Sequence, residues 1–226
     1  MSDHPAAPPP GPRFRRADTG RVEAFSDGVF AIAITILVLD LHPPEHPPGG
    51  LAHALLEQWP AYLGYLTSFG YIGVIWLNHH QAFTRLRYTD GGLHAANLAL
   101  LFTTAALPFP TAVLSTAFQH SFTDADARTA VLLYAVVAAA MCLSWYVLFR
   151  HLDRTPALHA AHMEPAFPRH GTVRSAAGVA GYLAAGLLGW AVHPAIAAVV
   201  FLLLPAFYGL TTEGLVRRRP VRTGSG

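Results

Sequence analysis

The stretch from Arg21 to Asp40, RVEAFSDGVFAIAITILVLD, decides the fold. One polar turn leads into an apolar run that continues to Leu41, and Pro43-Pro44 ends it because proline cannot continue a helix. A helix of around 20 residues spans the roughly 30 Å of bilayer hydrocarbon, so this run is long enough to cross a membrane. A signal peptide is the competing interpretation, but the run exceeds the usual h-region of about 7–15 residues and contains Asp27.

Five more apolar segments follow the first. Together they predict an all-α, polytopic membrane protein with six transmembrane helices. The predicted segments cover residues 21–41, 60–81, 93–117, 128–150, 172–192 and 194–213. Pro108 and Pro110 should kink or break the third helix. Pro194 leaves almost no loop between the last two helices, which predicts a tight hairpin.

The composition supports this class and excludes others. Of the 226 residues, 53% are apolar and 12% are charged, which is half of the roughly 25% charged residues in an average soluble domain. A very apolar soluble helical bundle is the remaining alternative. The net charge of +2 is too small to indicate a nucleic-acid partner. A single cysteine and the lack of P-loop, dinucleotide and zinc-protease motifs predict no resident metal, no cofactor and no enzyme.

The arginines predict the orientation. All 15 basic residues are arginines, and Arg128 is the only one in the first, third or fifth connection between predicted helices. The other fourteen fall in the N-terminal tail, the second and fourth connections and the C-terminus. Since basic residues gather on the cytoplasmic side of a membrane, both termini should be cytoplasmic. We expect a flexible tail over residues 1–20, a transmembrane domain over 21–213 and a basic tail over 214–226.

Two faces of the first helix carry different chemistry. At about 100° per residue, Ile32, Ile36 and Leu39 form one stripe about 60° wide, which Thr35 borders. Asp27 lies about 140° from Ile32. An ionisable residue within a membrane helix is costly and therefore indicates a functional site. Periodicity alone leaves the stripe open as lipid contact or bundle core, and Asp27 as a structural hydrogen-bonding hub.

Polar and aromatic residues also mark other helix ends. His79 and His80 end the second segment. Adjacent residues of a helix point about 100° apart, so the two histidines cannot easily bind the same metal ion. We expect hydrogen bonds to Asp27, Ser26 or Asn97 instead, with the inward-facing histidine left open. Trp59 and Trp145 fit interfacial aromatic belts. His151 follows the fourth segment and is interpreted as part of a solvated loop, with a pH sensor as the alternative.

Three of these motifs resemble the endosomal and lysosomal potassium channels, the transmembrane protein 175 family with its prokaryotic relatives. The motifs are Arg21-x-x-x-Phe25-Ser26-Asp27, Trp76-Leu77-Asn78-His79-His80 and Leu107-Pro108-Phe109-Pro110. The resemblance covers residues 21–111, whereas the last three helices match only in hydropathy and number. The chain length resembles the prokaryotic single-repeat form, which implies the plasma membrane of a prokaryote.

The resemblance implies a homotetramer in which the first helix of each subunit lines a central pore for potassium ions. Alignment from the signature implies aliphatic constriction rings at Ile32, Ile36 and Leu39, with Thr35 as a hydroxyl ring. It also implies a structural network of signature residues and their partners: Arg21, Phe25, Ser26, Asp27, Trp76, His79, His80 and Asn97.

The predicted function is therefore passive potassium conduction through a cation channel. The alternative is a proton-coupled secondary transporter in which Asp27 titrates. A membrane enzyme or structural protein that uses His79 and His80 is a third hypothesis.

Overall fold

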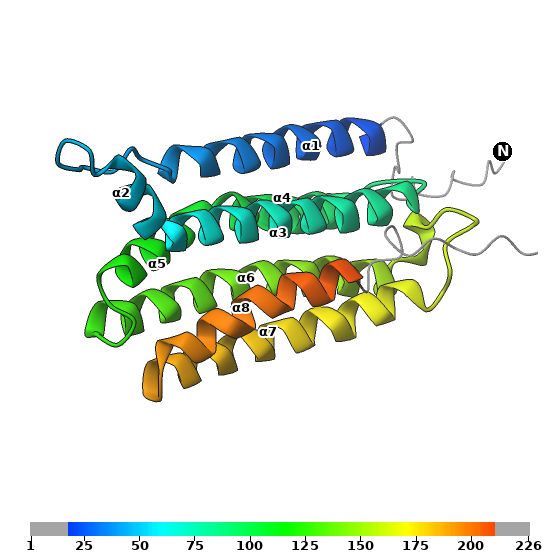
Figure 1. Cartoon of the computed structure of the whole chain (residues 1–226). Helices are drawn as coiled ribbons and strands as arrows, with labels where there is room; N and C mark the ends of the chain where they lie inside the picture. The colour runs from blue at the N-terminus through cyan, green and yellow to red at the C-terminus, as the bar shows by residue number, and fades with distance from the viewer. Residues whose placement is uncertain (1–17, 211–226) are drawn as a thin grey trace, which may run out of the picture.

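Long helices that run lengthwise beside one another make up the bundle (Figure 1). The computed structural model describes residues 18–210, and the predicted all-α class is confirmed. The elements are α1 (Asp18–Ile36), η1 (Leu37–Asp40), α2 (Leu51–Glu57), α3 (Trp59–Thr84), α4 (Gly91–Ala105), α5 (Pro108–His120), α6 (Ala125–Arg154), η2 (Pro156–Leu158), α7 (Phe167–Ala191) and α8 (Pro194–Leu210).

The third predicted segment consists of two helices, α4 and α5. Pro108 starts α5, where its missing N–H suits the first turn of a helix, and Pro110 follows within that turn. The predicted kink or break is thus confirmed. α1 begins at Asp18, ahead of the predicted start, and tightens into a 3₁₀ turn at Leu37. Of the predicted tails, residues 1–17 and 211–226 lie outside the part of the chain that the structure describes.

The helices are arranged so that α1 lies along one edge of the bundle and packs mainly on α3 and α4 (Figure 1). α6 packs against α4, α5 and α7, and α8 packs against α7. The α6–α7 contact is close because small residues meet there: a methyl group added to Gly186 would overlap the Cβ of Ala135. Small residues let the backbones of membrane helices approach in this way.

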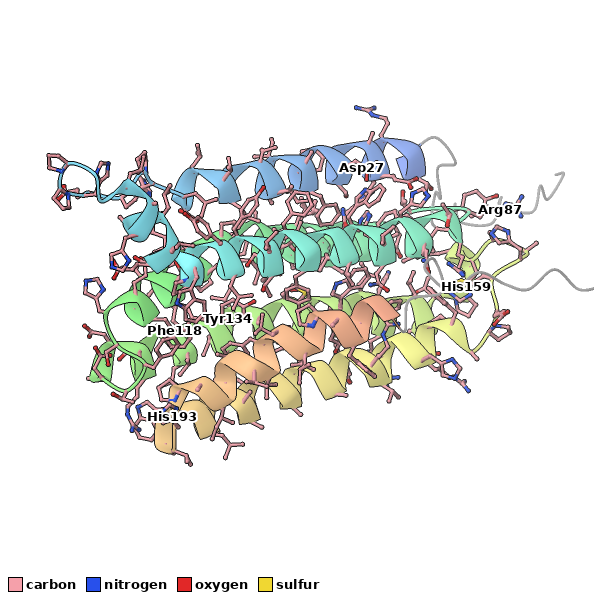
Figure 2. The ribbon with its side chains drawn as sticks, viewed as in Figure 1. Asp27, Arg87, Phe118, Tyr134, His159 and His193 are labelled. Carbon is pink, nitrogen blue, oxygen red and sulfur yellow. The ribbon has the colours of Figure 1, made fainter. Side chains whose placement is uncertain are left out.

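The two ends of the bundle differ in charge. The start of α1, the α3–α4 connection and the α6–α7 connection share one end, where Figure 2 shows Arg87 and His159. The two connections pair there, since the Arg87 N–H donates to the Leu158 carbonyl at 2.8 Å. We call this the arginine end. Arg128 lies at the opposite end, where its guanidinium donates to the carbonyl of Trp190, at the end of α7.

Three stretches of the described chain are long and apolar enough to cross a membrane: Thr19–Asp40, Gly91–His120 and Ala125–Arg154. α8 is a shorter apolar helix. α3 and α7 are not among these three stretches, and both contain tyrosine, tryptophan and several glycines. Six membrane-crossing helices are therefore a proposal, to which we return below.

Candidate functional site

The apolar stripe of α1 faces outward. The exposed fractions of Ile32, Ile36 and Leu39 are 60%, 45% and 68%. The opposite side of the same helical segment is buried in the core, through Phe30, Ala33 and Leu37. A stripe of three large apolar side chains that the described part of the subunit leaves exposed is a surface for lipid, for another subunit or for a pore.

Thr35 adds an oxygen to this stripe. Its hydroxyl is exposed and donates its proton to the Ile32 carbonyl, with 2.9 Å between the oxygens. A hydroxyl has one proton to donate and two lone pairs to accept with. Because the proton is committed to the backbone, the oxygen can offer its lone pairs to a cation beside the stripe.

Asp27 lies on another side of α1 and bonds to α3. The indole N–H of Trp76 donates to Asp27 Oδ1 at 2.8 Å. Asp27 lies nearer the arginine end than the apolar stripe does (Figure 2). The carboxylate thus binds a neighbouring helix of the same subunit and is partly buried.

A buried hydrogen-bond chain lies beside this pair and joins three helices. His79 on α3 is fully buried, and its Nε2 bonds to Asn97 Oδ1 on α4 at 2.8 Å. Since an amide oxygen only accepts, Nε2 carries the proton. Asn97 Nδ2 in turn donates to Ser26 Oγ on α1 at 3.0 Å, and Ser26 donates to the Val22 carbonyl. His79 is therefore the inward-facing histidine of the pair.

The remaining residues of the predicted network take no part in this buried series of hydrogen bonds. His80 is exposed and bonds through Nδ1 to Glu23 Oε1 at 2.7 Å, which ties α3 to α1 a second time. Phe25 is largely exposed. The structure gives Arg21, also exposed, no hydrogen bond or ion pair to another described residue.

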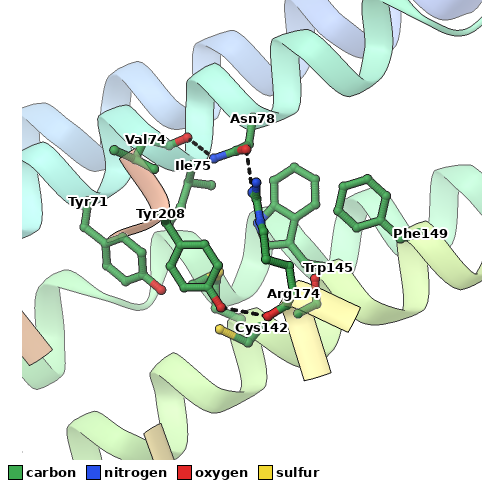
Figure 3. Close-up of a pocket in the computed structure, with 11 residues that line it drawn as sticks. Tyr71, Val74, Ile75, Asn78, Cys142, Trp145, Phe149, Arg174 and Tyr208 are labelled. Carbon is green, nitrogen blue, oxygen red and sulfur yellow. Dashed lines mark hydrogen bonds between the residues drawn. The ribbon is translucent and has the colours of Figure 1, made fainter. Parts of the chain in front are cut away.

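A second polar cluster lies on the other side of α3 (Figure 3). Arg174 on α7 donates through Nη2 to Asn78 Oδ1 at 2.8 Å, and the Tyr208 hydroxyl donates to the Arg174 carbonyl at 2.9 Å. A cavity of about 30 Å³ beside it has room for a single water molecule. The cluster ties α3, α7 and α8 together.

Sequence reasoning missed three of these contacts. Glu23 could have been found, since it lies one helical turn before Asp27 and so approaches the same helix end. His151 is half-buried within α6 and binds Asp90 Oδ1 at 2.8 Å, so its assignment to a solvated loop is wrong. No local signal pairs Arg174 with Asn78.

Among residues 18–210, no three His, Cys, Asp or Glu side chains form a group that could hold a metal ion.

Comparison with known proteins identifies the family of this chain. A model of the endosomal/lysosomal potassium channel TMEM175 matches residues 21–108. A potassium channel of Streptomyces collinus is 44% identical over 166 residues, which are 73% of this chain and 79% of that protein. The chain belongs to the TMEM175 family. The TMEM175 family is a family of ion channels, and with its apolar helices the chain is a multi-pass membrane protein.

Solved TMEM175 structures share the fold. The crystal structure of a lysosomal potassium-selective channel TMEM175 homologue from Chamaesiphon minutus superposes with a TM-score of 0.75 at 35% identity, covering 87% of this chain and 98% of that one. The human endosomal/lysosomal proton channel TMEM175 is 36% identical over 97 residues, 39% of this chain and 19% of the human protein. This chain therefore resembles the prokaryotic TMEM175 proteins in length.

Proposed function

We propose that the protein is a potassium-permeable cation channel in a prokaryotic plasma membrane. It conducts passively as a homotetramer, with α1 of each subunit around a central pore. Six helices cross the membrane and both termini are cytoplasmic. Similarity to potassium channels from Streptomyces collinus and Chamaesiphon minutus supports the transported ion.

The observation that carries the pore proposal is the outward apolar stripe of α1. In the tetramer, Ile32, Ile36 and Leu39 stack as three rings along the pore, and Ile32 is nearest the arginine end. The exposure of these side chains in the single subunit agrees with this role. An aliphatic ring cannot coordinate a cation, but it restricts hydration and closes the pore to water when it is narrow.

Selectivity follows from what each ring does to a hydrated ion. Potassium sheds water more easily than sodium, so an aliphatic constriction favours it modestly. Thr35 oxygens replace part of the lost hydration shell. Asp40 lies exposed at the outer mouth, where its carboxylate raises the local concentration of cations.

Flux through purified protein in liposomes tests the proposal. Potassium should move fast down its gradient and without coupling to protons. Ile32→Asn should raise cation flux and reduce discrimination between potassium and sodium, because a polar ring lowers the dewetting barrier. Ile34→Asn is the matched control, since Ile34 lies on another face of α1 and is partly buried.

Two results would contradict the pore assignment. If Ile32→Asn conducts like the parent while Ile34→Asn alters selectivity, another face of α1 lines the pore. If potassium moves only together with a proton gradient, the protein is a coupled transporter.

A further inference from the structure

An apolar groove lies between α3, α5 and α8, near the end of the bundle opposite the arginine end. Its volume is about 260 Å³. Side chains from three helices form its walls and α6 forms its floor: Leu63, Leu114, Phe118, Tyr134, Ala198 and Leu202. Figure 2 shows Phe118 and Tyr134 in this region. Leu63 and Leu202 are exposed, so the groove opens on the surface of the subunit.

The groove offers little to a polar ligand. None of the described residues that line it carries a charge. Thr111 donates to the Leu107 carbonyl and accepts from Ser68 at 2.8 Å, so these two hydroxyls satisfy each other. The hydroxyls of Thr67 and Ser115 donate to carbonyls of their own helices. An ion, a sugar or a lipid headgroup would therefore lose most of its hydration without an equivalent replacement.

Water is also a poor occupant. Apolar cavities of about 150 Å³ stay dry and take up apolar molecules instead. The groove is larger and its walls are almost wholly apolar. In a membrane protein, the apolar molecules beside an open groove are the acyl chains of lipids.

The rim of the groove fits a lipid that enters from the membrane surface. Trp59 is half-exposed at one end and stacks on Phe122, with ring centroids 5.9 Å apart. Phe122 also stacks on Phe118 at 4.7 Å. Aromatic side chains gather at the level of lipid headgroups. The groove thus runs from an aromatic cluster at headgroup level toward the hydrocarbon interior.

The segments of this chain outside the structure match the groove poorly. Residues 1–17 and 211–226 contain seven of the arginines and few large apolar residues. α8 also leads away from the groove, since Leu210 lies eight residues, or about 12 Å, beyond Leu202. We propose that the α3–α5–α8 groove binds one acyl chain of a membrane phospholipid.

Fluorescence quenching tests this proposal. The detergent-solubilised channel is titrated with phosphatidylcholine that carries bromine atoms on its acyl chains, and tryptophan fluorescence is recorded. We expect a saturable loss of fluorescence at one lipid per subunit. Trp59→Phe should remove that component, because Trp59 is the tryptophan at the rim.

A filled groove provides the decisive comparison. Ala198→Phe places a ring among the lining residues and should abolish saturable quenching. Ala184→Phe is the control, since Ala184 is exposed on α7 and does not line the groove, and it should quench like the parent. If Ala198→Phe fails to fold, Ala195→Leu fills the same groove with a smaller side chain.

Three results would overturn the proposal. The first is quenching without saturation, and the second is saturable quenching that survives in the filled variant. The third is a loss of oligomer in the Ala198→Phe variant, measured by light scattering. That third result would assign the groove to a second copy of the chain.

Discussion

At the residue scale, Asn97 is the side chain that links α1, α3 and α4. It is buried, with His79 as its donor and Ser26 as its acceptor. Asn97→Leu would leave the His79 N–H buried without a partner, so we expect a loss of about 1–3 kcal/mol in unfolding free energy. Thermal unfolding of the purified protein in detergent measures the loss.

The double variant separates desolvation from packing. Replacing both hydrogen-bond partners with apolar groups of similar shape can leave the stability nearly unchanged, whereas removing one partner leaves the other buried without a hydrogen bond. His79→Phe combined with Asn97→Leu should therefore be more stable than Asn97→Leu alone. A double variant less stable than either single one would mean that packing, and not the hydrogen bond, holds the helices here.

The bond between Trp76 and Asp27 leads to a second prediction. Trp76→Phe keeps an aromatic ring but removes the N–H donor, so the yield of the proposed tetramer should fall and the unfolding temperature should drop. The free energy of unfolding should fall by about 1 kcal/mol, because Trp76 and Asp27 are both partly exposed. Trp190→Phe is the control: Trp190 is half-exposed on α7 and should tolerate the change. Equal effects of the two substitutions would exclude a special role for the Asp27 bond.

Thr35 leads to a third prediction, which concerns permeation. Thr35→Val preserves the branched shape and removes the oxygen, so selectivity for potassium over sodium should fall more than total flux. Thr35→Ser keeps the oxygen and should conduct like the parent. Paired potassium and sodium flux measurements in liposomes distinguish the two. If Val and Ser behave alike at this position, shape and not the hydroxyl determines selectivity.

The sequence predicted which residues share a face of α1 better than it predicted the hydrogen-bond partners between helices. Helical periodicity grouped Ile32, Ile36 and Leu39 correctly, because spacing alone determines which residues share a face. Periodicity did not show whether His79 or His80 faces the interior, because that depends on which neighbouring helix each side chain contacts. The interfacial position expected for Trp145 is wrong: this indole is buried and stacks on Phe149 at 5.3 Å. Amphipathic residues near a helix end suit either environment, and only the tertiary packing decides between them.

At the scale of elements, glycines determine how closely α7 approaches α6. A methyl at Gly186 would collide with Ala135, whereas one at Gly181 would meet only Leu204, at an ordinary contact distance of 3.7 Å. Gly186→Ala should therefore destabilise the bundle by about 1–3 kcal/mol through overpacking. Gly181→Ala should be neutral or slightly stabilising, because alanine is the better helix former. Thermal unfolding of the two variants side by side checks this, and equal midpoints would contradict it.

The helices themselves were readily predicted from sequence. Proline and apolar run length located every long helix, including the interruption between α4 and α5, because both are local properties. Helix ends were less certain: α1 begins in a polar turn at Asp18 that hydropathy does not detect. α2 was not predicted at all, since a helix of 7 residues gives too short a pattern.

At the scale of the whole molecule, the orientation in the membrane can be tested directly. Single cysteines at Glu45 and Arg154, introduced with Cys142→Ala, should react with a membrane-impermeant thiol reagent from opposite sides. Cys142 is buried, so its removal should not affect labelling at the surface. Glu45 should be labelled in intact cells and Arg154 only after lysis. Labelling of both from the same side would overturn the proposed orientation.

The position of α1 at one edge of the bundle has an evolutionary consequence. α1 packs mainly on α3 and α4, and the family model matches residues 21–108, which include these three helices. The rest of the chain contacts α1 chiefly through α3 and α4, so substitutions in α6, α7 and α8 affect α1 only indirectly. Mutational drift should therefore accumulate in that half, while lineages that diverge in ion preference should differ first within α1 and the residues that support it.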